Sequence, residues 1–435
     1  MITATLNSCC RPIPPQSRRA KTFDLWKDST IERHGALRGR TKLKKFRIPA
    51  IVFGGGINGL GLVRNLGRSG VTTYCVVDRQ DYVVYSRFCK KCFIVPHIEE
   101  NKTVLMKFLA EFKKRLGDYA VLFPATDLFT VHLSELKETI ESDYYMPLPS
   151  HEVVRVLLDK KEFYQSISEH NIPHPITYFP KSPEDTKTIS EEVSYPIFVK
   201  PSMSQQFSSE FRKKGFIANS ADELMKYYLL ASKHEHDVIF QEIIPGLAAK
   251  NIYGIEGYFD KNFNPQALFA YCRLRGWPPV FGNTSLRESV SISKIVTPYV
   301  AARSYLQRLR FHGLMEAEWK RDPRDGVFKL LEINPRQSMQ NTLPTKCGIN
   351  LILTAYLDAI GEKVEYNEEY QKGIKWIDFM NDLRSSINTR VTIKEWVASL
   401  SNVKEYAFFA VDDAIPWIIN VFHTIRVTPI QRHAS

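Results

Sequence analysis

Apolar and polar positions along residues 47–148 follow two alternating periods. Three apolar runs have the length of a buried strand, and two stretches between them carry leucine, valine or phenylalanine at helical spacing. The strand-like runs are 48–53, 71–77 and 119–124, and the helix-like stretches are 60–66 and 105–112. Strands that alternate with helices are typical of a parallel α/β sheet, so the sequence predicts one such sheet up to about residue 148.

The pattern changes after residue 148. A long helix is expected over 151–170, and the apolar runs that follow alternate as in antiparallel strands. The predicted strands are 195–201, 239–244, 253–259 and 267–274, with helices at 298–312 and 350–360 and a hairpin over 313–334. The polar segment 202–210 is expected to be a flexible loop. The sequence therefore predicts an α+β region behind the α/β sheet.

These changes of pattern divide the chain into four parts. We expect a basic disordered extension (1–46), an α/β domain (47–148), an α+β domain (149–360) and a C-terminal extension packed on the body (361–435). Residues 1–23 hold arginine and serine but no acidic residue, so an organelle transit segment is an alternative for the first part.

The composition is that of a folded, water-soluble protein. Hydrophobic residues make up 44% and charged residues 24% of the chain, and no run approaches the roughly 18 apolar residues of a membrane span. Seven cysteines in 435 residues predict no disulfide framework, which favours a reducing compartment and a cytoplasmic location. We therefore expect no membrane partner.

The net charge of +12 is concentrated at the start of the chain. Residues 1–47 contain twelve Lys or Arg and three Asp or Glu, a net charge of +9, so only +3 remains for all the other residues. A body with so small a net charge offers little basic surface, and we expect no nucleic-acid partner.

Three glycines follow the first predicted strand directly. Gly54, Gly56 and Gly59 match the GxGxxG spacing, and Asp78 follows at about the distance expected for an acid that binds ribose. Glycines at such a place let backbone N–H groups approach an anion, as in an NAD-type site. Because only two clear strand–helix units follow, the loop can instead bind a substrate through Gly56 and Asn58, or form a tight turn.

The strongest candidate chemistry lies in the hairpin 313–334. A turn centred near residue 325 would place Glu318 opposite Glu332 and Glu316 opposite Asn334 on one face. The other face would carry Met315, Ala317, Trp319, Leu331 and Ile333. Facing carboxylates repel each other unless a cation joins them, and Mg²⁺ prefers such oxygen ligands. The alternative is a solvated polar face with the register slipped by two residues.

Two lysines stand where a phosphate would be bound. Lys160 lies in the helix that opens the second region, and Lys200 ends the apolar strand just before Pro201. A lysine that ends a buried strand faces a partly desolvated cleft and acts as a point charge for phosphate. The alternative for either residue alone is a lysine that reaches solvent.

One cysteine pair in the body has the spacing of a metal ligand pair. Cys89 and Cys92 form a single CxxC, and Cys9 and Cys10 lie in the extension. A structural zinc site needs four suitably spaced ligands. Because the body has no second spaced pair, we do not predict a zinc site.

The order of these segments resembles the ATP-grasp superfamily. The resemblance is carried by Lys160 in a Leu-Asp-Lys helix, the strand that ends at Lys200 and Pro201, the segment 241–246, and Glu318 with 332–336. It covers about residues 47–360, and it looks closest to carboxylate–amine ligases of the D-aspartate-ligase-like branch. It implies an α/β fold in which a Rossmann-like domain precedes a two-subdomain α+β ATP-grasp unit that clasps ATP.

The resemblance also implies roles for individual residues. Lys160 and Lys200 would bind phosphate oxygens, and the hinge against adenine would be Gln241, Glu242, Ile243 and Ile244. Mg²⁺, or Mn²⁺ in its place, would be held by Glu318, Glu332 and Asn334. The catalytic arginines would be Arg275 and Arg336, and a substrate contact would come from Arg273.

We therefore expect an ATP-dependent ligase that activates a carboxylate as an acyl phosphate and joins it to an amine, forming ADP and phosphate. Its partners would be a small-molecule carboxylate and amine, and the pattern is compatible with a homodimer. Two alternatives remain. One is an NAD(P)-binding oxidoreductase that uses the Gly54–Gly59 loop, and the other is a nucleotide-binding module without catalysis.

Overall fold

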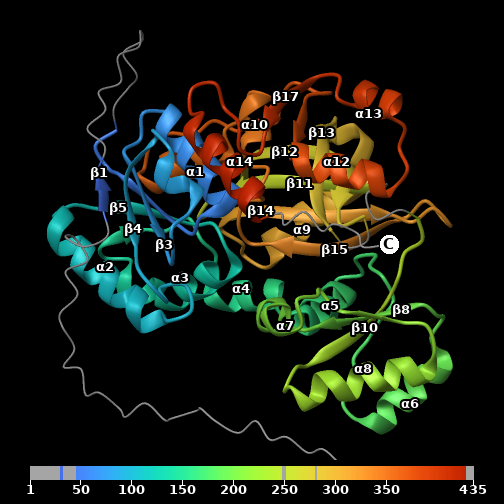
Figure 1. Cartoon of the computed structure of the whole chain (residues 1–435). Helices are drawn as coiled ribbons and strands as arrows, with labels where there is room; N and C mark the ends of the chain where they lie inside the picture. Colours follow the sequence, from blue (N-terminus) through green and yellow to red (C-terminus); the bar gives the residue numbers. More distant parts are fainter. Residues whose placement is uncertain (1–29, 33–45, 247–250, 280–281, 428–435) are drawn as a thin grey trace, which may run out of the picture.

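The computed structural model describes residues 30–32, 46–246, 251–279 and 282–427 of the chain (Figure 1). The predicted extension 1–46 lies outside these residues except for Phe46 and the strand β1 (Thr30–Glu32), which pairs antiparallel with β4. No helix within the described ranges is both long and apolar enough to cross a bilayer.

The first part of the chain folds around a six-stranded sheet in the order β1-β4-β3-β2-β5-β6. The strands after β1 are parallel, as the alternating pattern predicts. They are β2 (Ala50–Phe53), β3 (Thr73–Val77), β4 (Cys89–Ile94), β5 (Ala120–Pro124) and β6 (Tyr144–Tyr145). The accompanying helices are α1 (Gly56–Arg68), η1 (Tyr82–Tyr85), α2 (Lys102–Leu116) and α3 (Asp127–Ile140).

A small antiparallel sheet follows, in the order β7-β10-β8-β9. Its strands are β7 (Thr177–Tyr178), β8 (Ile197–Pro201), β9 (Phe216–Ala218) and β10 (Val238–Glu242). The helices of this region are α4 (His151–Leu158), α5 (Lys160–Glu169), α6 (Pro183–Glu192), α7 (Ser204–Phe211) and α8 (Ala221–Lys233). Figure 1 shows α6 and α8 together on the outer side of this small sheet.

The largest sheet has seven strands in the order β15-β14-β11-β12-β13-β16-β17. The strands are β11 (Ile252–Phe259), β12 (Pro265–Trp277), β13 (Asn283–Ser289), β14 (Gly313–Arg321), β15 (Phe328–Asn334), β16 (Lys375–Ile377) and β17 (Val403–Tyr406). The helices are η2 (Ile292–Ile295), α9 (Val296–Arg308), α10 (Thr342–Lys346), α11 (Leu351–Ala359), α12 (Phe379–Asn388), α13 (Ile393–Ser399) and α14 (Ile415–Val427). Residues beyond 361 thus extend this sheet through β16 and β17.

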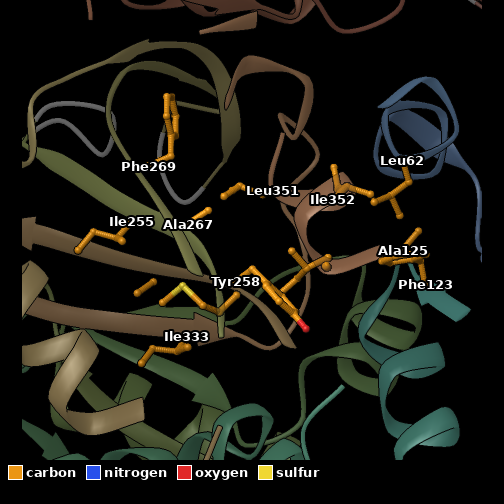
Figure 2. Packing of buried hydrophobic residues seen from close by; sticks show 14 of the residues in the cluster. Leu62, Phe123, Ala125, Ile255, Tyr258, Ala267, Phe269, Ile333, Leu351 and Ile352 are labelled. Carbon is orange, nitrogen blue, oxygen red and sulfur yellow. The ribbon is translucent and has the colours of Figure 1, made fainter. Parts of the chain in front are cut away.

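One apolar core joins the first sheet to the seven-stranded sheet. Leu62 of α1 and Phe123 of β5 lie near Ile352 of α11, and the same cluster continues to Tyr258 and Ile333 under the large sheet (Figure 2). The small sheet has a separate core around Val199 and Phe240. The α/β unit and the large sheet therefore share one core, which the small sheet joins through Ile239 of β10.

Two predicted elements differ in the structure. The helix expected over 151–170 is broken at Asp159, whose carboxylate accepts hydrogen bonds from the backbone N–H groups of Lys161 and Glu162 and so starts a second helix. The segment expected to be a flexible loop, 202–210, contains most of α7, because Phe207 is fully buried and fixes that turn of chain against the small core.

Candidate active site

A cavity of about 630 Å³ lies between the small sheet and the hairpin β14–β15. Among the predicted site residues, twelve line it: Asn58, Lys160, Lys200, Gln241, Glu242, Ile243, Ile244, Arg273, Glu318, Glu332, Asn334 and Arg336. Gly56 and Arg275 do not line it. Residues separated by up to about 280 positions in the chain are therefore brought to one space.

The hairpin has the register that the sequence predicts. Glu318 pairs with Glu332, and Glu316 pairs with Asn334. The predicted face of Leu331 is wrong, because a β-bulge after Glu318 makes Trp319 pair with Leu330 instead. That bulge leaves Leu330 in the core and turns Leu331 toward the cavity.

The carboxylates of Glu316 and Glu318 share one phenol. The Tyr271 hydroxyl lies 2.8 Å from Glu316 Oε1 and 3.2 Å from Glu318 Oε1. Gly254 of β11 lies between β12 and β14 in the register, and a side chain there would meet the Tyr271 ring within 2.1 Å. The glycine therefore makes room for Tyr271 to reach across β11.

Burial strongly affects these acids. It raises the pKa of Glu316 to about 8, helped by the nearby Glu318 and Glu256 carboxylates. Burial likewise raises the pKa of Glu318, to which the Glu332 carboxylate adds. Burial thus disfavours the charged forms of two neighbouring acids, the buried Glu316 and the half-buried Glu318, and a cation bound between them would stabilise those charged forms.

A buried ion pair between Arg287 and Glu256 lies close to Glu316. Arg287 donates to Glu256 Oε1 at 2.7 Å, and its guanidinium stacks 4.3 Å from the centre of the Tyr271 ring. Arg287 also donates to the backbone oxygen of Gln340 at 2.8 Å, and the Ser338 hydroxyl donates to Glu256. This network links the acids of β14 to the segment after β15.

Three lysines face the acids from the small-sheet side. The Lys200 ammonium lies 3.5 Å from both Gln241 Oε1 and the Tyr164 hydroxyl, and burial lowers its pKa. Burial, with the neighbouring charge of Lys200, lowers the pKa of Lys160 to about 8. Lys214 donates to Asn283 Oδ1 at 2.9 Å and also lines the cavity.

The lysines set the charge of the acid that faces them. Burial alone would raise the pKa of Glu332, but Lys200, Lys160 and Lys214 lower it on balance. The charged form of Glu332 is therefore favoured, whereas burial disfavours the charged forms of Glu316 and Glu318. The cavity has a cationic side made of lysines and an acidic side made of glutamates.

The predicted hinge borders the cavity at the end of β10. The Gln241 amide donates to Thr177 Oγ1 at 3.0 Å, and its side chain is buried. The Glu242 carboxylate accepts from Lys329 at 3.1 Å and from Arg324, so it is tied to the hairpin. Lys320 donates to the backbone oxygen of Ile244 at 2.7 Å. These bonds fasten the small sheet to the large one on that side.

The glycine loop is occupied by the protein's own carboxylate. Both oxygens of Asp81 lie 3.0 Å from the backbone N–H of Gly56, and a side chain at Gly55 would meet Asp81 within 2.4 Å. The predicted ribose acid, Asp78, accepts instead from the backbone N–H of Glu99. Both features that suggested a dinucleotide site therefore have internal partners.

The far end of the cavity is formed by the α/β unit and the segment after β15. Asn58 donates to the backbone oxygens of Ala125 at 2.7 Å and Gln337 at 2.9 Å, so it holds the two together. Arg336 forms an ion pair of 2.6 Å with Asp127 at the start of α3. This arrangement places Arg336 in the cavity and orients its guanidinium.

The two arginines of β12 point to opposite faces of the sheet. Arg273 pairs with Arg287 and lines the cavity, whereas a bulge at the next residue makes Arg275 pair with Leu286. Arg275 binds both oxygens of the buried Asp382 at 2.7 and 2.8 Å. Arg275 therefore lies outside the cavity, where a regular alternation would have kept it beside Arg273, and its catalytic role stays a prediction.

Several cavity residues were not predicted as site residues. They are Glu99, Asp127, Lys214, Glu316, Lys320 and Gln340. Asp127 lies at the carboxyl end of a parallel strand, which is where open α/β sheets bind ligands, so the sequence did carry a signal for it. Lys214 and Gln340 lie outside any predicted strand end, and no local pattern pointed to them.

The donor set fits a hard cation, although no preformed cluster of three His, Cys, Asp or Glu ligands exists in the described residues. Glu318 and Glu332 supply two carboxylates and Asn334, whose amide lies 3.2 Å from Glu332 Oε1, supplies an amide oxygen after rotation. Mg²⁺ takes one or two protein carboxylates and leaves its other positions to water and phosphate.

The chain is similar to known proteins over most of its length. It is 23% identical over 320 residues to a D-aspartate ligase from Enterococcus faecium, covering 69% of this chain and 74% of the relative. No protein-family model matches it.

Solved structures share its fold at low sequence identity. The N5-carboxyaminoimidazole synthetase of Staphylococcus aureus has a TM-score of 0.60 at 15% identity, covering 80% of this chain and 88% of that one. The biotin carboxylase of Campylobacter jejuni has a TM-score of 0.60 at 14% identity, covering 75% and 74%.

Proposed function

We propose that the chain is a member of the ATP-grasp superfamily and acts as an ATP-dependent carboxylate–amine ligase that forms ADP and phosphate. The observation that carries the proposal is the cavity in which three lysines face the carboxylates of β14 and β15. Lysines on one side and acids on the other are the arrangement that a metal–nucleotide phosphate chain requires.

ATP would lie along the cavity with its base at the hinge Gln241–Ile244 and its phosphates among the lysines. Lys160, Lys200 and Lys214 would neutralise phosphate oxygens as point charges. Glu318, Glu332 and Asn334 would hold Mg²⁺, or Mn²⁺, which when bound supplies charge neutralisation at the phosphates. A synthetase structure of similar fold carries ADP and a biotin carboxylase structure of similar fold carries MgADP, which supports this choice of ligands.

The remaining cavity would hold the substrates at the end formed by Asn58, Arg273 and Arg336. An oxygen of the substrate carboxylate attacks the γ-phosphorus of ATP, and the bond to the ADP oxygen breaks to give an acyl phosphate. The amine nitrogen then attacks the carbonyl carbon, phosphate leaves, and the nitrogen loses a proton. Positioning and charge stabilisation by these arginines and lysines account for the protein's part.

The oxidoreductase alternative is disfavoured by the glycine loop. A dinucleotide needs the backbone N–H groups of such a loop for its pyrophosphate. In this chain the Gly56 N–H already binds Asp81, whose carboxylate would also repel a phosphate. Homodimer formation and a cytoplasmic location stay predictions.

The proposal is tested by ADP release from ATP and Mg²⁺ across panels of carboxylates and amines. D-Aspartate is the first carboxylate to include, because one relative is a D-aspartate ligase. Hydroxylamine is the amine of choice for the first round, since it captures an acyl phosphate as a stable hydroxamate. We expect the wild type to form a hydroxamate and Glu332→Gln to form none. ADP release that no carboxylate stimulates would contradict the ligase proposal.

A further inference from the structure

One acid of the cavity, Glu99, is left without a counter-ion by the part of the chain that the structure describes. It lies in the segment between β4 and α2, is half-buried and lines the cavity. The Thr126 hydroxyl donates to Glu99 Oε1 at 2.6 Å, and the backbone N–H of Glu99 donates to Asp78 Oδ1 at 2.9 Å. Partial withdrawal from water is costly for an unpaired carboxylate, so a cation from outside the protein would stabilise it.

The position of Glu99 is one where open α/β sheets bind ligands. Asp78 follows β3 and Thr126 follows β5, and β2 lies between these two strands in the first sheet. By bonding to both residues, Glu99 bridges the ends of β3 and β5 across the end of β2. The chain runs from β2 to β3 on one side and places β5 on the other side, so the strand order reverses here. Ligands of open α/β sheets bind in the crevice outside the carboxyl ends of the strands at such a point.

Two acids near Glu99 already have partners. Asp78 accepts the backbone N–H of Glu99, and Asp127 forms the 2.6 Å ion pair with Arg336. Burial raises the pKa of Glu99, and the negative charges of Asp78 and Asp127 add to this rise. A cation bound at this place would therefore stabilise the charged form of Glu99 more than those of its two neighbours.

Among the groups that react in the proposed ligase, the amine is the one that occurs as a cation. The carboxylate, the phosphates of ATP and the acyl phosphate are anions, and the guanidinium of Arg336 suits them. Thr126, which bonds to Glu99, precedes Asp127, the partner of Arg336, so Glu99 lies at the substrate end of the cavity. A divalent metal ion fits Glu99 less well, because it prefers several oxygen ligands and the described residues contain no group of three acidic, histidine or cysteine ligands.

We propose that the Glu99 carboxylate binds the ammonium group of the amine substrate, with the Thr126 hydroxyl keeping the carboxylate in position. The inference rests on the proposed ligase function and extends it by giving the amine a place and a charge. ATP would occupy the side of the cavity next to the small sheet, and the amine would occupy the side next to the first sheet. The ligase would then favour amines that are protonated near neutral pH over neutral nucleophiles.

The test compares a cationic with a neutral nucleophile. Hydroxamate formation from hydroxylamine, ATP·Mg²⁺ and D-aspartate, or the carboxylate most active in the panel, is measured with increasing methylamine. At pH 8 methylamine is a cation, as a lysine side chain is, whereas hydroxylamine is neutral. In the wild type, methylamine should lower hydroxamate formation, because it occupies the ammonium subsite or takes the acyl group itself. Glu99→Gln keeps an oxygen for the Thr126 hydroxyl but loses the charged acceptor for the ammonium. It should need about ten- to a hundredfold more methylamine for the same fractional loss of hydroxamate.

Glu100→Gln is the matched control, because it removes one negative charge from an exposed neighbour. It should respond to methylamine as the wild type does, and Glu99→Asp, which keeps the charge, should need less methylamine than Glu99→Gln. An equal response of Glu99→Gln and the wild type would overturn the proposal, as would a wild type that methylamine does not affect. A Glu99→Gln variant that needs more carboxylate substrate but responds to methylamine as the wild type does would also overturn it, by assigning the acid to that substrate. A wild type that forms no hydroxamate with any carboxylate would instead contradict the ligase function itself.

Discussion

Removal of the Tyr271 hydroxyl group tests how Glu316 and Glu318 are kept able to bind a cation. In Tyr271→Phe the hydrogen bonds to Glu316 and Glu318 disappear while the ring still packs on Arg287. That hydroxyl lowers the pKa of both acids, against the larger effect of burial, which raises it. Its loss therefore raises both pKa values further, and protons compete more strongly with Mg²⁺ at neutral pH.

The size of the effect follows from the hydrogen bond. A bond to a charged group contributes about 1.5–3 kcal/mol, and one pKa unit corresponds to 1.36 kcal/mol, so a rise of about one to two units is expected. Because the pKa of Glu316 already stands at about 8, more of this pair is protonated at pH 7. We expect Mg²⁺-dependent ATP binding to weaken by about ten- to a hundredfold at pH 7 and by less at pH 9.

The assay is calorimetric titration of ATP with Mg²⁺ at the two pH values. Tyr258→Phe is the matched control, because its buried hydroxyl also donates to a carboxylate, Asp358, at 2.6 Å, but outside the cavity. Both variants should lose similar folding stability, and only Tyr271→Phe should change the metal dependence. The reasoning would be refuted if the wild type and Tyr271→Phe bound ATP with Mg²⁺ equally well at pH 7. It would also be refuted if the loss of affinity in Tyr271→Phe were as large at pH 9 as at pH 7.

Three further predictions concern charged residues. Lys160, with a pKa of about 8 in the free protein, should take up a proton when ATP binds at pH 8 and much less of one at pH 6.5. Calorimetric titrations in buffers of different ionisation enthalpy measure this proton uptake. The variant Lys160→Arg should abolish the uptake. Lys214→Ala should weaken ATP binding by about tenfold because one hydrogen bond to a charged group is lost. Lys213 is an exposed neighbour, so Lys213→Ala should leave ATP binding unchanged. Equal ATP affinities of Lys214→Ala and the wild type would show that Lys214 does not bind ATP. Arg275→Ala should lower the free energy of unfolding, measured in urea, by about 3–5 kcal/mol because Asp382 is left buried without its cationic partner. The ATP affinity of the folded variant should be unchanged, whereas a selective loss of turnover would support a catalytic role for Arg275.

Much of the fold was predictable because the hydrophobic periodicity of a helix or a strand is contained in a short stretch of sequence. Alternation of strand and helix gave the parallel sheet, and the neighbouring structures bear out the predicted ATP-grasp fold class. The facing of Glu318 and Glu332 was predictable because a hairpin turn fixes the register of both strands at once. The division into four parts stays a prediction.

The errors arose where one extra residue or one tertiary contact decided the outcome. A β-bulge turns Leu331 to the opposite face of the sheet from the one predicted, and another does the same for Arg275. The alternation of apolar and polar residues along a strand does not reveal where a bulge lies. The burial of Phe207 made a helix of a segment that reads as polar. The binding of Asp81 to the glycine loop depends on a residue 25 positions away, so the loop alone resembled an anion site.

The central claim is that this cavity binds ATP and that the glycine loop does not bind a dinucleotide. Calorimetric titration of the wild type, Lys200→Ala and Gly56→Ala with ATP·Mg²⁺ and with NADH tests it most directly. We expect ATP·Mg²⁺ to bind the wild type, to bind Lys200→Ala about ten- to a hundredfold more weakly, and to bind Gly56→Ala nearly as well as the wild type. Tight NADH binding that Gly56→Ala abolishes and Lys200→Ala preserves would contradict the account.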